Sequence, residues 1–382
     1  MKIAHWQTLE QEDTQEISAD IDGFRLWYRL PKAYPFSTSG DPFLAIALIP
    51  AMLKGEAIEV DPSLPVSPKL LGNIPLIQEI HHAWNPVLKI IPVHAKTSPA
   101  EPLNTGSFSF FSGGVDSTYT FLKRQKEISH VVFIHGFDFF LDRGPFETAV
   151  ARNSSFVHDY GKTLIPVETN YFPFSYRYNL SRHLTQGSAL ASVALLLGFS
   201  RAYMPGSLAY SQLIPSGSHP LTDPLYSNEC VETVHDGGEA RRVDKVMKVA
   251  GDESALANLR VCFEDMNVNC GTCVKCLRTM APLELLGARS APFPPLPPRR
   301  TFRRMNWKKE TMYLKENIEL AVQKGNKDLG RTLSVCLRKN EHAQLLRDMD
   351  RALLGGLVKR ARRKLRRASP GVRRITAELP GD

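Results

Sequence analysis

The sequence predicts an α/β fold with a doubly wound parallel sheet, on the basis of three observations. Short apolar runs rich in β-branched or aromatic residues alternate with helix-length stretches from about residue 107 to residue 288. This alternation is typical of parallel sheets covered on both faces. A glycine pair, Gly113-Gly114, directly follows the first of these runs and precedes a helical pattern. The composition is that of an ordinary globular chain, because 43% of the 382 residues are hydrophobic and 23% are charged.

Each predicted strand is a short apolar run, and each predicted helix is a longer stretch between two such runs. The strands are expected at residues 107–111, 130–136, 163–169, 201–206 and 259–263. The helices are expected at residues 118–125, 145–160, 181–199 and 239–250. Ligands bind at the carboxyl ends of the strands in such sheets, so we expect a site in the loops that follow the strands.

The flanking segments differ from this central domain, which we place at residues 104–290. Residues 1–103 combine strand-like runs with an apolar stretch, FLAIALIPAMLKG, and with frequent proline and glycine, which predicts an N-terminal α+β module. The strand-like runs are residues 24–28, 57–60 and 88–93. Residues 291–382 begin with a proline-rich linker, APFPPLPPRR, and continue as a basic segment of helical composition.

The positive charge is concentrated in this C-terminal segment. Residues 303–382 carry 21 lysines and arginines but nine acidic residues, whereas the whole chain has a net charge of +9. The run KRARRKLRR at residues 359–367 can neutralise nucleic-acid phosphates, hold an acidic protein partner, or form a solvated helix. No segment has the roughly 18 apolar residues that span a bilayer, and the first residues lack a secretory pattern. We therefore expect a cytoplasmic protein without a membrane partner.

The strongest motif is FSFFSGGVDST at residues 108–118, where an apolar strand runs directly into a helix pattern. Adjacent glycines let the backbone adopt positive φ and approach a ligand closely. A helix start offers N–H groups and a partial positive charge, and serine hydroxyls add donors. These features predict an anion cradle in which Asp116 holds Mg²⁺ or orients the loop. A glycine-rich turn without a ligand is the alternative.

Ser-Gly-Gly-x-Asp-Ser after a first strand resembles the PP-loop of the N-type ATP pyrophosphatases, which have the adenine nucleotide alpha hydrolase-like fold. In that superfamily the loop holds the pyrophosphate end of ATP, and a substrate oxygen attacks the α-phosphate to give an AMP ester. The resemblance implies ATP and Mg²⁺ as cofactors, Asp116 and Ser117 as catalytic residues, and adenine near Phe133 and Gly136. The nucleotide-binding residues it implies in the loop are Ser112, Gly113, Gly114, Val115, Asp116 and Ser117.

Four of the six cysteines fall in one window, residues 262–276, which we interpret as a zinc loop. They are Cys262, Cys270, Cys273 and Cys276. Clustered cysteines in a chain without secretory features indicate a metal site rather than disulfides. Four thiolates match tetrahedral zinc and close its coordination shell, so the ion would be structural. An iron–sulfur centre and a metal-free reduced cluster are the alternatives. Lys275, Arg278 and the peptide N–H groups of Gly271 and Thr272 can offset the anionic sulfurs.

The stretch NCGTCVKCLRT at residues 269–279, with Cys262 upstream, is similar to the zinc loop of the QueC family of 7-cyano-7-deazaguanine synthases, which also carry a PP-loop. One detail departs from that family's pattern, since Arg278 stands two residues after Cys276 rather than three. The resemblance covers residues 107–288, about half of the chain. It implies an ATP-dependent ligase or synthase that adenylates the carboxylate of a 7-deazapurine, such as 7-carboxy-7-deazaguanine, releases pyrophosphate, and forms an amide, nitrile or conjugate. QueC enzymes are often dimers, so a homodimer is one option.

The flanking segments have no counterpart in the short QueC enzyme, so the acceptor can instead be a protein or a nucleic acid. QueC-like proteins with added domains occur among bacterial anti-phage systems, which by analogy alone extends the resemblance to a defence or modification pathway. Two other functions compete with this one. The chain can be a PP-loop enzyme that adenylates a tRNA base, with Cys230 as the convenient thiol, or a nucleotide-sensing scaffold with a vestigial ATP site.

Residues 205–229, rich in glycine, serine and proline, follow a predicted strand and are expected over the site. His219 and Asp223 are the candidate substrate contacts there. The alternative is an Asx-type turn with a surface histidine. His81 and His82 lack cysteine or aspartate partners at metal spacing, so we expect them at the surface or in the core.

Overall fold

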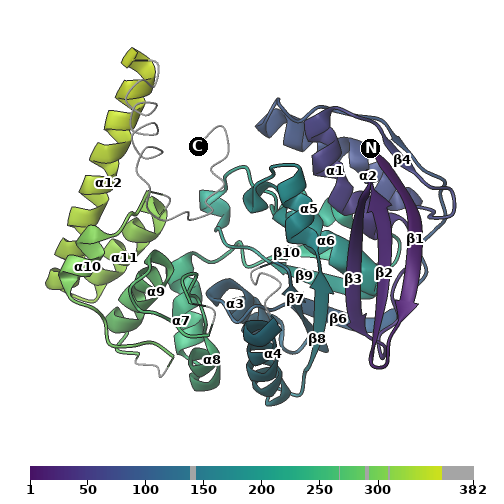
Figure 1. Ribbon diagram of the computed structural model, residues 1–382. Coiled ribbons are helices and arrows are strands. Elements are labelled where there is room, and N and C mark those ends of the chain that lie inside the picture. Colours follow the sequence, from purple (N-terminus) through teal and green to yellow (C-terminus); the bar gives the residue numbers. More distant parts are fainter. Residues whose placement is uncertain (138–142, 266, 289–291, 309, 355–382) are drawn as a thin grey trace. The chain divides into compact units, whose positions relative to one another are not determined.

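The computed structural model describes the chain except for residues 138–142, 266, 289–291, 309 and 355–382. The chain divides into two compact units, which are described separately (Figure 1). The first comprises Met1–Arg241 and Asn258–Arg260, and the second comprises Arg242–Ala257 and the residues from 261 onward. This division differs from the three predicted segments, since the cysteine loop belongs to the same unit as the C-terminal helices. None of the helices in the described ranges combines the length and apolar character needed to cross a membrane.

The first unit is built on one sheet of ten strands in the order β10-β9-β6-β7-β8-β3-β2-β1-β4-β5. Five of these strands are mutually parallel, with β6 between β7 and β9. They are β6 (Asn104–Phe110), β7 (His130–His135), β8 (Thr163–Thr169), β9 (Phe199–Pro205) and β10 (Glu232–Asp236). Numbered along the chain, their order is third, second, first, fourth, fifth, which is a doubly wound order. The predicted α/β class and mostly parallel sheet are confirmed.

Helices cover both faces of these five strands. Successive side chains of a strand point to opposite faces, so the contacts of two neighbouring residues show what covers each face. Along β7, Ile134 belongs to the core that also contains buried residues of the helices α1 and α6. Its neighbour Phe133 instead stacks on Phe146 of α4, with ring centroids 5.4 Å apart. The covering helices are α1 (Asp41–Lys54), α2 (Pro68–Trp84), α3 (Val115–Arg124), α4 (Arg143–His158), the short α5 (Tyr171–Arg177) and α6 (Arg182–Leu197).

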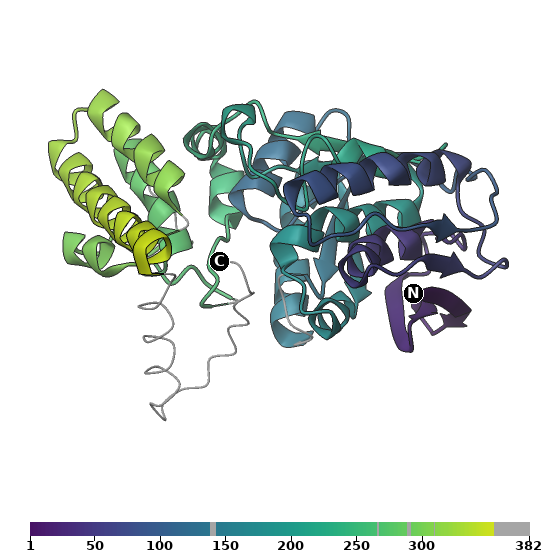
Figure 2. The same ribbon diagram turned by 90° about the horizontal axis from the view of Figure 1, so that it is seen from above.

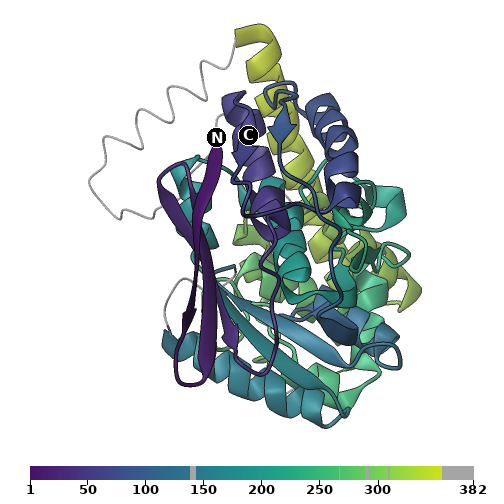
Figure 3. The same ribbon diagram turned by 90° about the vertical axis from the view of Figure 1, so that its right-hand side faces the viewer.

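The N-terminal strands extend this same sheet instead of forming a module of their own. Three of them, β1 (Lys2–Glu10), β2 (Thr14–Ile21) and β3 (Phe24–Pro31), form an antiparallel meander that joins the sheet where β3 pairs with β8. Figure 3 shows them in purple as long strands beside the teal ones. The short β4 (Ile58–Val60) and β5 (Val93–His94) complete the edge. The meander shares a core with α6, since the hydroxyl groups of Tyr28 and Ser192 are hydrogen-bonded.

One predicted strand is wrong. Residues 259–263 are not extended in a ladder, because the N–H of Arg260 donates to the carbonyl of Gly113 at 2.8 Å, and that of Val261 donates to the side chain of Asn269. The fifth parallel strand is β10, whose polar sequence ETVHD gives little strand signal. Of the predicted strand at 88–93, only Val93 is in a strand.

The second unit is helical. Its helices are α7 (Arg242–Ala250), α8 (Glu253–Asn258), α9 (Val274–Leu285), α10 (Arg299–Arg304), α11 (Thr311–Gln323) and α12 (Lys327–Leu354), drawn in green and yellow (Figures 1 and 2). Leu277 of α9, Leu314 of α11 and Leu333 of α12 share one apolar core. This core explains why α9, which follows the cysteines, groups with the C-terminal helices. The basic run 359–367 lies outside the described residues.

Candidate functional site

The glycine-rich loop follows β6, the central strand of the parallel group. The chain leaves β6 toward β7 on one side and later returns to β9 on the other, so the loop lies at the point where the strand order reverses. Ligands bind at such points in doubly wound sheets, outside the carboxyl ends of the strands. The helix α3 begins at Val115, directly after Gly114. The predicted strand–loop–helix arrangement is thus present.

The loop is closed by its own two serines. The hydroxyl of Ser117 accepts a hydrogen bond from the N–H of Ser112 at 3.2 Å and donates to the carbonyl of Gly114 at 3.1 Å. The hydroxyls of Ser112 and Ser117 lie 3.3 Å apart. Gly113 has φ +75°, a conformation that L side chains rarely adopt. These contacts hold the backbone in a fixed curve at the start of α3, as an anion cradle requires.

Three polar residues from distant parts of the chain, none of them among the predicted site residues, lie against this curve. A Cβ added to Gly113 would lie 3.1 Å from Oδ1 of Asn153 and 3.5 Å from Nη2 of Arg152, both on α4. The backbone of Arg260 is bonded to Gly113. No local pattern marks these residues, since nothing in a helix sequence says which loop its side chains will meet.

The side chain of Arg152 has no ion pair within the described part of the chain, and its hydrogen bond there is to Asn153 at 3.5 Å. Burial, together with repulsion from Arg260, lowers its pKa to about 10, so the guanidinium remains charged at neutral pH. Positive charge therefore lies close to Gly113 of the loop. Asp116, half-buried in the first turn of α3, is the acidic residue of the loop itself.

The two residues predicted near adenine differ in their surroundings. Gly136 directly follows β7 at the carboxyl edge with φ +96°, and a Cβ there would lie 2.1 Å from the carbonyl oxygen of Thr169. Only glycine allows this close approach of two strand ends. Phe133 is buried, and its ring packs on Phe146 beneath α4. The ring of Phe133 is therefore a core side chain, and a contact with adenine there stays a prediction.

Both candidate substrate residues are buried. The carboxylate of Asp223 accepts hydrogen bonds from the hydroxyl of Ser218 at 2.7 Å and from the N–H of His219 at 3.1 Å, and it pairs with His235 at 2.7 Å. The ring of His219 packs edge-on against Trp84. Asp223 thus holds the loop 205–229 together from within, and the alternative of a surface histidine is wrong because His219 is buried. Their contact with a substrate stays a prediction.

In the second unit the four cysteine sulfurs form a compact cluster, all within 4.8 Å of one another. The sulfurs of Cys262 and Cys273 are 3.9 Å apart, and those of Cys270 and Cys276 are 4.0 Å apart. A tetrahedral zinc ion with Zn–S bonds of about 2.3 Å separates its sulfurs by about 3.8 Å. The cluster could therefore hold a metal ion such as zinc.

Hydrogen bonds stabilise the thiolate forms of two of these cysteines, Cys270 and Cys273. The hydrogen bonds that Cys273 receives from the thiol and the N–H of Cys276 lower the pKa of Cys273 to about 4. Although burial opposes it, the N–H groups of Thr272 and Cys273 lower the pKa of Cys270. Thiolates are the form that binds metal.

Lys275 and Arg278, the two cations predicted to offset the anionic sulfurs, make contacts with other groups. The ammonium of Lys275 lies 3.1 Å from the centre of the Phe263 ring, and the guanidinium of Arg278 pairs with Glu310 at 2.6 Å and lies over Tyr313. Arg278 therefore connects α9 to the segment before α11. Its ion pair joins the cysteine loop to the helical core.

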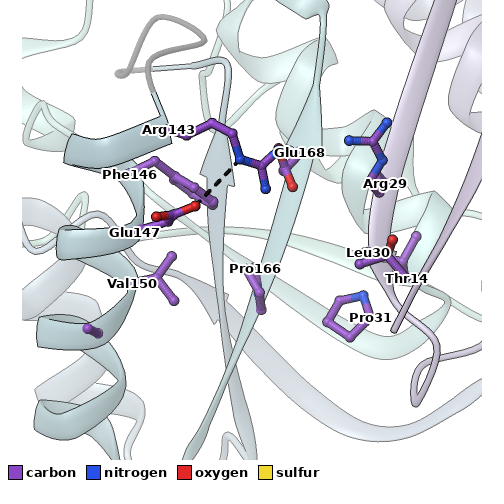
Figure 4. Close-up of a pocket in the computed structure, with 11 residues that line it drawn as sticks. Thr14, Arg29, Leu30, Pro31, Arg143, Phe146, Glu147, Val150, Pro166 and Glu168 are labelled. Atoms are coloured by element: carbon purple, nitrogen blue, oxygen red, sulfur yellow. Dashed lines mark hydrogen bonds and ion pairs between the residues drawn. The ribbon is translucent and has the colours of Figure 1, made fainter. Parts of the chain in front are cut away.

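The first unit also has an open pocket of about 290 Å³ between α4 and β3, over β8 (Figure 4). Arg143 lies 3.4 Å from Glu168 and 3.5 Å from Glu147, and Phe146 and Pro166 form an apolar wall. A hydrogen bond with His135 and the charge of Arg143 lower the pKa of Glu168. None of the predicted site residues lines this pocket.

Comparisons with protein families, with curated proteins and with solved structures gave no match to this chain.

Proposed function

We propose that this chain is an ATP-dependent ligase or synthase of the PP-loop type, which cleaves ATP between the α and β phosphates. The observation that carries the proposal is the serine-closed loop, Ser112 to Ser117, at the start of α3 where the strand order reverses. Such a loop binds phosphate through backbone N–H groups and the helix dipole. Among phosphate ligands we propose ATP, because the sequence of this loop resembles the PP-loop.

The chemistry begins with a substrate carboxylate oxygen, which attacks the α-phosphorus of ATP. A new P–O bond forms, the bond between the α-phosphorus and the oxygen that bridges to the β-phosphorus breaks, and pyrophosphate leaves with the bonding electrons. Ammonia or another nucleophile then attacks the activated carbonyl and AMP departs. Mg²⁺, held through Asp116, would neutralise charge on the leaving phosphates. The protein contributes position and electrostatic stabilisation by the loop, Arg152 and the start of α3.

The substrate that we propose is a 7-deazapurine carboxylate, such as 7-carboxy-7-deazaguanine. This choice is supported by the combination of the loop with the cysteine pattern at residues 269–279, which resembles the QueC zinc loop. The cluster is compatible with zinc because its four sulfurs lie within 4.8 Å of one another, and those of Cys270 and Cys273 accept N–H hydrogen bonds. With four protein ligands the ion is structural and takes no part in the reaction.

The test is product analysis of the full chain with ATP, Mg²⁺ and 7-carboxy-7-deazaguanine, with and without ammonia. We expect AMP and pyrophosphate that depend on the deazapurine, and mass spectrometry then identifies an amide, nitrile or conjugate. Asp116→Asn should abolish AMP release, whereas Asp159→Asn, at an exposed position on the same unit, should not. Absence of AMP with every carboxylate tried would refute the proposal.

The tRNA-modifying alternative needs a reactive thiol, and Cys230 is poorly suited to that role. Its thiol donates to the carbonyl of Ala100 at 3.0 Å, and burial and the nearby Glu229 raise its pKa. Few thiolates form at neutral pH under those conditions. AMP release with bulk tRNA in place of the deazapurine would favour this alternative. A scaffold would keep its function after Asp116→Asn.

A further inference from the structure

The helix α4 presents two polar side chains, Arg152 and Asn153, to the glycine-rich loop. Neither of them lines the pocket of Figure 4. Phe146 and Val150 line that pocket, whereas Phe156 stacks on Phe111, the residue before Ser112, with ring centroids 5.6 Å apart. This aromatic contact fixes α4 against the end of β6. It holds Arg152, one turn earlier, beside Gly113.

The guanidinium of Arg152 is a cation without an ion pair among the described residues. It is half-buried and has no carboxylate partner within the described residues, whereas the half-buried Arg29, Arg124 and Arg299 each pair with one. Removing a charge from water without a counterion is costly, so such a group indicates a ligand of opposite charge. The nearest ligand-binding feature is the loop, because Nη2 lies 3.5 Å from the Cβ position of Gly113.

Asn153 positions this arginine. Its side chain is fully buried, and its Oδ1 accepts hydrogen bonds from Nδ2 of Asn258 at 3.2 Å and from Arg152 at 3.5 Å. Its own Nδ2 has no partner among the residues described. Buried amide donors are usually satisfied, so this donor, on the residue whose Oδ1 lies next to Gly113, points to a missing acceptor.

We propose that Arg152, positioned by Asn153, forms a second anion subsite under the loop, which recognises two linked phosphates rather than one. The N–H groups at the start of α3 take one phosphate, and the planar guanidinium takes its neighbour across the anhydride oxygen. This inference rests on the proposed function and adds a selectivity to it. Pyrophosphate and the β and γ phosphates of ATP fill both subsites, whereas inorganic phosphate and AMP fill only one.

The test measures binding of inorganic pyrophosphate and inorganic phosphate, each with Mg²⁺, to the full chain by calorimetry. Wild type should prefer pyrophosphate. Arg152→Gln should weaken pyrophosphate binding by roughly tenfold to a hundredfold, as expected for the loss of one charge-assisted hydrogen bond, and leave phosphate binding unchanged. Arg152→Lys should recover part of the loss. Arg201→Gln, an exposed arginine paired with Glu232, is the matched control and should bind as wild type does.

A second variant guards against misfolding of the first. Asn153→Asp places a carboxylate beside Arg152 and should reduce pyrophosphate affinity to a similar extent, with thermal unfolding confirming that each variant folds. If wild type binds neither ATP nor pyrophosphate, the proposed function fails together with the subsite. If wild type binds both, and the folded variants at Arg152 and Asn153 bind pyrophosphate equally well, the subsite alone is overturned.

Discussion

Lowering the pH should destabilise the first unit, and His81 should make a measurable contribution to this effect. This histidine is on α2, is 1% exposed, and has no hydrogen-bond partner for either ring nitrogen among the described residues. Burial, and to a lesser extent the charge of His219, lower its pKa to about 4 from an ordinary value of 6.5. Since the folded pKa lies below the unfolded one, the unfolded chain takes up this proton first as the pH falls. The contribution of neutral His81 to the free energy of unfolding is therefore fully present above pH 6.5 and is lost as the pH falls toward 4.

The magnitude follows from the shift. A difference of about 2.5 pKa units corresponds to roughly 3 kcal/mol once both states are protonated, and to roughly 2 kcal/mol at pH 5. His81→Leu removes the titrating group and keeps an apolar side chain, so the variant should lack this part of the pH dependence. His94→Leu, at an exposed position, is the matched control.

The assay is urea unfolding at pH 7.5, 6 and 5, followed by tryptophan fluorescence. Trp84 packs edge-on against His81, so the signal reports on this part of the first unit. Between pH 7.5 and 5, wild type and His94→Leu should lose about 2 kcal/mol more than His81→Leu does. If all three proteins lose the same free energy of unfolding, then His81 is not a buried neutral histidine and the reasoning is refuted.

Three further predictions concern the loop, the cysteine cluster and the core beneath the loop. Gly113→Ala should weaken pyrophosphate binding by roughly tenfold or more, because φ is +75° there and the added methyl group would press on Asn153; unchanged affinity in calorimetry would contradict this geometry. Cys276→Ser should reduce bound zinc, measured by elemental analysis, and lower the melting temperature of the second unit; full zinc occupancy would argue against four-thiolate coordination. Phe156→Ala should cost about 3–5 kcal/mol in urea unfolding, because its buried ring stacks on Phe111, and a cost below about 1 kcal/mol would show that this packing is wrong.

The parts of the site that the sequence predicted are the local ones. The curve from Ser112 to Ser117 depends on adjacent glycines and on two hydroxyls five residues apart, all within one short segment. The cysteine cluster depends on closely spaced residues, since three of its four ligands lie between Cys270 and Cys276. Short-range geometry of this kind is set by residue type and spacing, so it can be derived without knowing the rest of the fold.

The predictions about the surroundings of the site were less successful, for a physical reason. The strand β10 is mostly polar, and it is a strand because β9 offers it a hydrogen-bonding edge. Apolar residues at 259–263 resembled a strand, yet Arg260 bonds to the loop and Val261 to Asn269. Tertiary partners decide between ladder and loop in such short segments, which overrides the local preference.

By itself the sequence determined that the chain is α/β, that a glycine-rich loop between a strand and a helix follows residue 111, and that four cysteines gather in one segment. Only the tertiary structure decided that the N-terminal strands join the same sheet and that Asp223 is sealed among Ser218, His219 and His235. It also decided that Arg152 meets Gly113. Burial and charge compensation depend on residues brought together from distant parts of the chain, and no spacing rule within one segment carries that information.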